Sequence, residues 1–208
     1  MRLLAALVPL LLLSLPGCAS KERPASPTQQ TPDTFRVKME TTKGDVIVEV
    51  HREWAPLGAD RFYNLVDAGF YNDVAFFRAI AGFMVQFGIS GDPKLQRTWN
   101  ASPIADDPVM QSNLRGYVTF AKKSAPNSRT TQIFVNYKDN VNLDAMGFAP
   151  FGQVVEGMDV LDSLYKGYGE GGPRGKGPIQ PMMESRGNAY LKESFPKLDY
   201  VRTATVVK

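Results

Sequence analysis

Short apolar runs, separated by turns that contain glycine or charged residues, recur along this chain and constrain its fold more than any other feature. Residues 35–41 and 46–50 alternate apolar and polar side chains on either side of a turn at 42–45, which predicts a β-hairpin. Further strands are predicted at residues 74–80, 83–89, 117–121, 131–136, 151–155 and 200–207. So many short strands favour a β-barrel or a sandwich, and pairing of the last strand with the first would leave no exposed edge.

Two segments have the apolar spacing of amphipathic helices, which would cap the open ends of such a barrel. The first lies between Pro56 and Gly69, and the second covers residues 157–165. Residues 166–187 contain seven glycines and three prolines. Loops of this length are found at functional sites or on mobile surfaces, and we favour a surface excursion here. A short helical turn is predicted at residues 190–195.

The N-terminal residues differ in composition from the rest of the chain. Residues 3–15 form an apolar run that is too short to span a bilayer comfortably, so residues 1–17 are interpreted as a signal peptide. The run ends in Leu15-Pro16-Gly17-Cys18, which resembles the lipobox of bacterial lipoproteins and implies acylation of Cys18. The alternative is an ordinary signal peptide with a free cysteine near its cleavage site.

This organisation predicts three parts: the leader 1–17, a lipidated Cys18 with a flexible tether over 18–33, and one domain over 34–208. The tether is predicted because Pro, Ser, Thr and Gln dominate it. The lipid anchor would attach the protein to a membrane of the cell envelope. In a Gram-negative cell, Ala19 after the cysteine implies the outer membrane, with the domain facing the periplasm.

The scarcity of two residue types excludes several kinds of chemistry. The chain contains one Cys and one His, which excludes a disulfide within the chain and a Cys/His zinc site. A nucleophile–imidazole mechanism would have to rest on His51 alone, so we expect neither a metal nor a cofactor. The formal net charge of +3 is too small to indicate a nucleic-acid partner.

One arginine and one glutamine interrupt an otherwise apolar stretch at residues 76–88. Side chains alternate faces along a strand, so Phe76 shares a face with Arg78, and Met84 shares one with Gln86. These residues could form an apolar pocket that contains a few hydrogen-bond donors. Alternatively, they belong to a core strand whose arginine reaches the rim or pairs with a carboxylate.

Three blocks of the chain resemble the cyclophilin family. Residues 76–88 read F-F-R-A-I-A-G-F-M-V-Q-F-G, and the family signature is F-H-R-x-I-x-x-F-M-x-Q-G-G. Ala121 and, further on, residues 131–135 resemble the family's A-N and S-Q-F-F-I. Leu143-Asp144, followed by residues 151–158, resembles L-D and F-G-x-V-x-x-G-M. The blocks occur in family order and at near-family spacing, and they cover most of residues 35–165.

The resemblance implies a mainly β fold, which is a closed eight-stranded antiparallel β-barrel capped by two α-helices. It also implies peptidyl-prolyl cis-trans isomerase activity, in which Arg78, Gln86 and Gln132 have the catalytic roles. The implied substrate-binding residues either form the wall that holds the proline ring or meet the substrate backbone beside it: Phe83, Met84, Ala121, Lys122, Phe134, Leu143 and Phe148.

Such an enzyme would act as a monomer on proline-containing peptides and on unfolded exported proteins. Arg78 would donate a hydrogen bond to the prolyl nitrogen when the peptide bond is twisted, a contact that the planar ground state cannot accept. The alternative is a non-catalytic peptide-binding or chaperone-like module that uses the same groove. Binding alone does not require Arg78, which favours the isomerase.

The chain departs from the family pattern at four places. Phe77 replaces the histidine before the catalytic arginine, and Phe87 replaces the first glycine of Q-G-G. Lys122 and Lys123 replace smaller residues after Ala121. Asn142 stands where many eukaryotic members have a tryptophan that contributes to cyclosporin binding, so we expect weak binding of that drug.

Overall fold

The first two strands form the predicted hairpin. The structure is a computed structural model that describes residues 31–207, so the predicted leader, Cys18 and the tether up to residue 30 lie outside it. Strands β1 (Thr34–Thr41) and β2 (Asp45–His51) pair antiparallel, with Val37 opposite Val48. Both valines are buried, because alternation along each strand turns one set of side chains toward the core.

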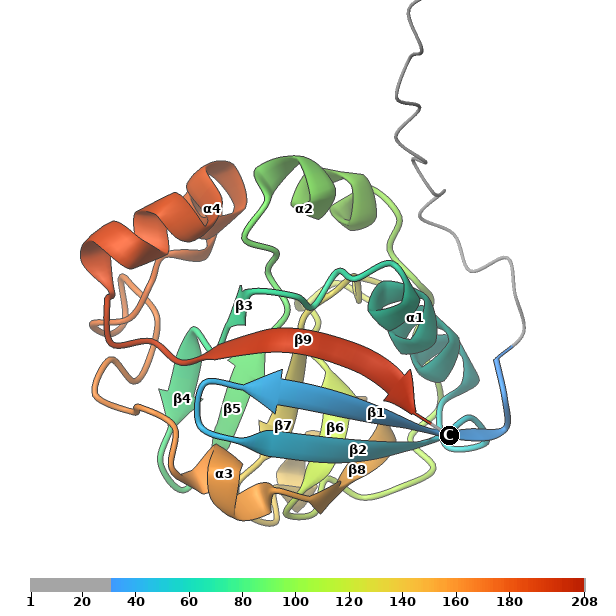
Figure 1. The fold of residues 1–208 in the computed structure, drawn as a ribbon. Coiled ribbons are helices and arrows are strands. Elements are labelled where there is room, and N and C mark those ends of the chain that lie inside the picture. Colours follow the sequence, from blue (N-terminus) through green and yellow to red (C-terminus); the bar gives the residue numbers. More distant parts are fainter. Residues whose placement is uncertain (1–30, 208) are drawn as a thin grey trace, which may run out of the picture.

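The hairpin lies within a curled sheet of nine antiparallel strands (Figure 1). The sheet order is β3-β9-β1-β2-β8-β6-β7-β5-β4. The remaining strands are β3 (Val74–Ala75), β4 (Arg78–Ile80), β5 (Met84–Phe87), β6 (Tyr117–Phe120), β7 (Ile133–Asn136), β8 (Pro150–Glu156) and β9 (Tyr200–Val207). The mainly β class is therefore confirmed, and β9 pairs with β1 as expected.

The predicted closed eight-stranded barrel needs correction in two respects. The sheet is a curled half-barrel whose end strands, β3 and β4, do not pair with each other, and it has nine strands because the single strand predicted at 74–80 is two strands. Its first part, β3, pairs with β9, and its last part, β4, pairs with β5. Between them the chain buries Phe76 in the main core and Phe77 in a separate cluster. These two rings anchor the crossing from one end of the sheet to the other, so residues 74–80 join the two ends of the curled sheet.

The main core fills the concave interior and is rich in aromatic rings. Phe151 on β8 lies with its ring centroid 5.0 Å from that of Phe62 and 5.1 Å from that of Phe120. Phe62 comes from helix α1 (Pro56–Asp67), which covers the sheet as predicted. This packing fixes the inward faces of the strands, so the outward faces of β4, β5 and β7 are held at defined positions.

Four α-helices are described where two were predicted. The two predicted helices correspond to α1 and α3 (Met158–Asp162). The two additional helices are α2 (Pro93–Asn100) and α4 (Gln180–Ser194), and a 3₁₀ turn, η1, covers Val141–Leu143. Asp92 caps α2 by accepting a hydrogen bond from the Lys94 N–H at 2.8 Å. The helix was not predicted because it is too short to show an apolar periodicity after this cap.

Helix α4 includes the end of the predicted excursion 166–187 and the predicted helical turn at 190–195. Gly187 interrupts it with a non-helical backbone (φ 58°), and a side chain there would lie 2.0 Å from the Gly91 carbonyl oxygen. This glycine lets α4 approach the segment before α2, and Figure 1 shows the two helices side by side. The helix was not predicted because a glycine breaks its pattern.

A second apolar cluster lies under α4 and contains Phe77. Its buried members are Ala75, Phe77, Ile89, Met183, Tyr190, Leu191 and Leu198. Phe77 therefore replaces a polar family residue at a position that α4 covers in this chain.

Within residues 31–207, no helix is long and apolar enough to cross a membrane. In the same range, no three His, Cys, Asp or Glu side chains form a group that could hold a metal ion.

Candidate active site

The β4–β5 hairpin presents Arg78 and Gln86 on the outer face of the sheet. The two residues are directly opposite each other in the antiparallel register. Along β5, Val85 and Phe87 belong to the main core, whereas Met84 belongs to a third apolar cluster on the other face. The period of two along the strand thus separates the core from the groove. The pocket predicted from this stretch is confirmed for Arg78, Met84 and Gln86. The prediction that Phe76 shares the face of Arg78 is wrong, because β4 begins only at Arg78 and Phe76 turns into the main core.

A row of hydrogen bonds runs from Arg78 across two neighbouring strands. Arg78 Nη1 donates to Gln86 Oε1 at 2.9 Å, and Gln86 Nε2 donates to Gln132 Oε1 at 2.8 Å. Gln132 Nε2 in turn donates to Gln180 Oε1, on the first turn of α4, at 3.1 Å. Gln86 is only 7% exposed. The three predicted catalytic residues are therefore brought together, and Gln180 extends the row beyond them.

An apolar pocket lies beside the guanidinium of Arg78. The buried members of the cluster that forms it are Met84, Phe134 and Leu143, and Phe83, Ala121 and Phe148 pack against them. The rings of Phe134 and Phe148 meet edge to face at 5.8 Å, a favourable aromatic arrangement. Lys122 Nζ lies 5.6 Å from the centroid of the Phe148 ring and 3.5 Å from an Asp106 oxygen.

These residues surround one open groove. It is lined by Arg78, Phe83, Met84, Gln86, Ala121, Lys122, Phe134, Leu143, Phe148 and Gln180. All the predicted substrate-binding residues are included. The predicted catalytic residue Gln132 does not line this groove. It contacts Gln86, which does, through the hydrogen bond described above.

The segment that carries Leu143 and Phe148 is tied to the rest of the site by side-chain hydrogen bonds. Asn140 Nδ2 donates to the Phe83 carbonyl at 2.9 Å, which joins η1 to the β4–β5 turn. Asp144 accepts from Ser112 and from both the N–H and the side chain of Asn113. These bonds to the carboxylate outweigh its partial burial and lower the pKa of Asp144 below its ordinary value.

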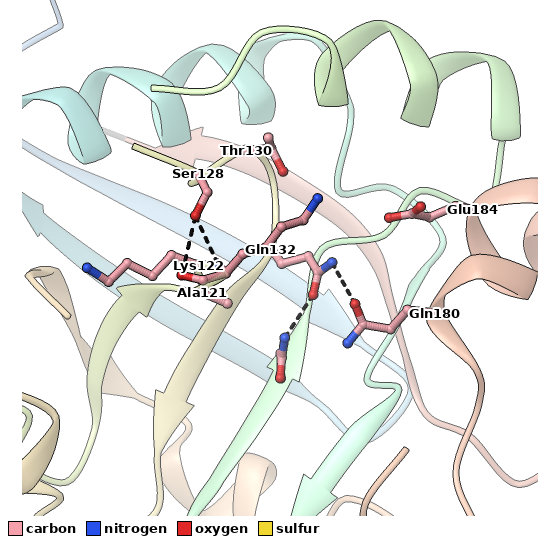
Figure 2. A pocket seen from close by; sticks show the side chains of 9 residues that line it. Ala121, Lys122, Ser128, Thr130, Gln132, Gln180 and Glu184 are labelled. Carbon is pink, nitrogen blue, oxygen red and sulfur yellow. Dashed lines mark hydrogen bonds between the residues drawn. The ribbon is translucent and has the colours of Figure 1, made fainter. Parts of the chain in front are cut away.

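A second groove adjoins the first and shares Gln86, Ala121, Lys122 and Gln180 with it. Lys123, Ser128, Thr130, Gln132 and Glu184 complete its lining. Figure 2 shows Gln132 and Gln180 bonded to each other across this groove. Its lining is polar, with lysines from one side and Glu184 from α4 on the other. The whole site therefore combines an apolar pocket with a polar extension.

Sequence reasoning missed Glu170, which forms an ion pair with Arg78. Glu170 Oε1 accepts from Arg78 Nε at 2.6 Å, and Oε2 accepts from Nη2 at 2.7 Å. Glu170 lies 92 residues from Arg78 in the chain, within the glycine-rich segment. No periodicity marks such a residue. The sequence indicated such a contact only through the alternative interpretation of residues 76–88, in which the arginine of a core strand pairs with a carboxylate.

Comparison with known proteins identifies a family. The sequence model of the cyclophilin-type peptidyl-prolyl cis-trans isomerases matches residues 36–183. Peptidyl-prolyl cis-trans isomerase A of Dickeya dadantii is 33% identical over 187 residues, which cover 88% of this chain and 94% of the relative. Peptidyl-prolyl cis-trans isomerase B of Escherichia coli is 34% identical over 136 residues, which cover 62% and 82%.

Solved structures share the fold. A cyclophilin-type peptidyl-prolyl cis-trans isomerase of Cryptosporidium parvum matches with a TM-score of 0.63 at 20% identity, over 84% of this chain and 98% of the other. The same enzyme crystallised in the presence of the dipeptide Ala-Pro matches with a TM-score of 0.60 at 20% identity, over 83% and 99%.

Proposed function

The chain belongs to the cyclophilin-type peptidyl-prolyl cis-trans isomerases, and we propose that it performs this isomerisation in the groove beside Arg78. One observation carries the assignment of the site. The guanidinium of Arg78 is held by Gln86 at the edge of a pocket of apolar side chains that could contain a proline ring. Proline-containing peptides are the proposed ligands, and the Ala-Pro dipeptide used with the Cryptosporidium parvum enzyme supports this choice.

The chemical task is to lower the barrier to rotation about an X–Pro peptide bond. Amide resonance makes that barrier about 18–20 kcal/mol, so uncatalysed isomerisation takes tens to hundreds of seconds. When the bond twists, resonance is lost and the prolyl nitrogen regains a lone pair. A donor aimed at that nitrogen stabilises the twisted state and not the planar one, which is the requirement for catalysis.

Arg78 supplies that donor in our proposal. A guanidinium stays charged throughout the physiological pH range and its N–H groups form a rigid, planar array. The apolar side chains beside it exclude water that would otherwise compete for the prolyl nitrogen, which strengthens the hydrogen bond. Phe134, Met84 and Leu143 would hold the ring while the preceding carbonyl turns. No proton transfer or covalent bond is needed.

The non-catalytic alternative explains the apolar pocket but not the arrangement of Arg78. Its guanidinium is held on one side by Gln86 and on another by Glu170. Ordering a flexible arginine in this way has an entropic cost, and a pocket that only binds an apolar ring gains nothing from it. The fixed guanidinium therefore favours the isomerase.

The test is a protease-coupled isomerisation assay on a tetrapeptide that contains an X–Pro bond. We expect Arg78→Ala to lower kcat/KM by about two decades or more, because it removes the hydrogen bond made in the twisted state. The far-UV circular dichroism spectrum should stay unchanged, which checks that the variant is folded. Near-wild-type activity in the folded variant would refute the role of Arg78.

The cellular role is proposed from the sequence outside the described residues. We propose that the enzyme assists the folding of unfolded exported proteins in the cell envelope, as a monomer held to the membrane by a lipid on Cys18. In a Gram-negative cell this is the outer membrane, with the domain facing the periplasm. The apolar leader that directly precedes Cys18 supports the anchor.

A further inference from the structure

The ion pair between Glu170 and Arg78 is bidentate. Glu170 Oε1 meets Arg78 Nε at 2.6 Å and Oε2 meets Nη2 at 2.7 Å. The Arg78 side chain is 23% exposed and the Glu170 side chain is 37% exposed, so solvent screens much of their Coulombic attraction. What the two parallel hydrogen bonds provide is orientation, because a planar guanidinium that faces a carboxylate in this way has one preferred plane.

The glycine-rich segment before α4 is folded around the backbone of Glu170. The Gly177 N–H donates to the Glu170 carbonyl oxygen at 2.8 Å. A side chain added at Gly175 or Gly177 would lie 2.3 or 2.8 Å from that same oxygen, closer than a Cβ atom can approach. The two glycines are therefore needed for the loop to close on Glu170, and the segment is more than a surface excursion.

The carboxylate of Glu170 is also held from within the loop. The Gly171 N–H donates to Glu170 Oε1 at 2.9 Å, the same oxygen that accepts from Arg78 Nε. The Arg78 guanidinium, and then this N–H, hold the pKa of the Glu170 carboxyl below its ordinary value. The carboxylate is thus ionised at neutral pH, when a bidentate pair with arginine is strongest.

Both ends of the loop are anchored to the folded domain. Before Glu170, the Tyr165 N–H donates to Asp199 Oδ2 at 2.8 Å. After it, α4 begins with Gln180, which accepts from Gln132, and Met183 is buried in the second apolar cluster. A loop fixed at both ends can hold its carboxylate in place.

Glu170 approaches Arg78 from outside the substrate groove. Arg78 lines that groove, and Glu170 does not. Of the five N–H bonds of the guanidinium, two are directed to Glu170 and one to Gln86. The second N–H on Nη1 faces Met84 Sδ, a weak acceptor in the groove lining, at 3.9 Å. That weakly bonded N–H and the second N–H on Nη2 are the donors left for a substrate. The ion pair therefore leaves donors for a substrate and does not fill the space that a proline ring would occupy.

From these contacts we propose that Glu170 is a positioning residue for the isomerisation, because it fixes the plane of the Arg78 guanidinium with the remaining donors turned toward the groove. This proposal rests on the proposed function, since it concerns the same reaction. It also assigns a role to the glycine-rich segment, which is to carry a carboxylate to the outer side of the catalytic arginine.

The test is a double-mutant cycle between Glu170 and Arg78 in the full chain. We expect Glu170→Gln to lower kcat/KM on the tetrapeptide about tenfold, through kcat rather than KM, because the donor is misplaced while the pocket is intact. In the Arg78→Ala background the same change should have no further effect, since Glu170 acts through Arg78. Glu193→Gln removes an exposed glutamate that pairs with Arg186 on α4 and serves as the matched control.

A second measurement does not depend on turnover. The Nε–H signal of Arg78 in an NMR spectrum should be protected from exchange with water in the wild type and in Glu193→Gln, and it should lose this protection in Glu170→Gln. An active wild type with unchanged or increased kcat/KM in Glu170→Gln would overturn the positioning role alone. A loss that is equally large with and without Arg78 would do the same. A wild type that does not accelerate isomerisation would refute the proposed function as well.

Discussion

At the scale of single residues, the donor-only side chain of Arg78 determines how the neighbouring glutamine amides are oriented. An arginine can only donate hydrogen bonds, so Gln86 must turn its Oε1 toward Arg78 Nη1 and its Nε2 toward Gln132. Gln132 then has its Oε1 occupied and donates through Nε2 to Gln180. The direction of the whole row follows from one guanidinium, and each buried amide in it has a partner.

Phe134 provides a test of the apolar side of the groove. It lies beside Met84 and Leu143, is 5% exposed, and meets Phe148 edge to face. We expect Phe134→Ala to raise KM about tenfold or more, because it removes much of the surface on which the proline ring would pack. Steady-state kinetics on the tetrapeptide would measure this change.

The control for Phe134→Ala is Val206→Ala, which truncates a partly exposed apolar residue on β9. Strand β9 is not paired with β5 or β7, so this change should leave KM unaltered. If Phe134→Ala kept the wild-type KM while remaining folded, the proline ring would have to be held elsewhere.

At the scale of elements, the strands near the site follow from the pattern of their side chains. The alternation along β5 sends Val85 and Phe87 to the core and leaves Met84 and Gln86 on the groove side. Helix α4 does not follow from its pattern in the same way, because Gly187 interrupts it and its buried residues serve a cluster made with Phe77 and Ile89. That cluster exists only when the two segments meet.

Met183 tests how strongly α4 is docked. It is 1% exposed and belongs to the cluster that contains Phe77, Tyr190 and Leu191. Met183→Ala should lower the free energy of unfolding by about 2–5 kcal/mol, since it leaves a cavity in a packed site. Urea unfolding followed by circular dichroism would measure the change.

The matched control is Met110→Ala, because Met110 is 63% exposed and loses the same atoms without leaving a cavity. Its midpoint in urea should stay within experimental error of the wild type. An equally small shift for Met183→Ala would show that α4 contributes little to the stability of the domain.

At the scale of the whole molecule, two long connections shape the site. Residues 74–80 join the two ends of the sheet, and the glycine-rich segment before α4 returns to β4, where it contacts Arg78. The first connection depends on β3 pairing with β9 and β4 with β5. The second brings Glu170 to Arg78. The pairing of β3 with β9 and the contact of Glu170 with Arg78 both link residues far apart in the sequence, so the curled shape of the sheet and the completion of the site both depend on long-range packing.

The attachment of the molecule to a membrane is tested at Cys18. In a Gram-negative host, the wild type should be found in the membrane fraction and should incorporate labelled fatty acid, because acyl chains on one residue give stable anchoring. Cys18→Ser should be found in the soluble fraction without label. Ser20→Ala, which keeps the cysteine, is the control, and an unlabelled wild type in the soluble fraction would contradict the anchor.

The sequence by itself determined the mainly β class, the hairpin at 35–50, and the set of groove residues from Arg78 to Phe148. The class and the hairpin follow from local alternation, and the groove residues follow from the resemblance of three motifs to the cyclophilin family; the structure places them on β4, β5, β7, η1 and the loops beside them. Only the tertiary structure decided the division of the strand at 74–80, the docking of α4 over Phe77, and the pairing of Glu170 with Arg78. The reason is physical: a strand pattern repeats every two residues and can be read locally, whereas a contact across 92 residues exists only after the intervening chain has packed.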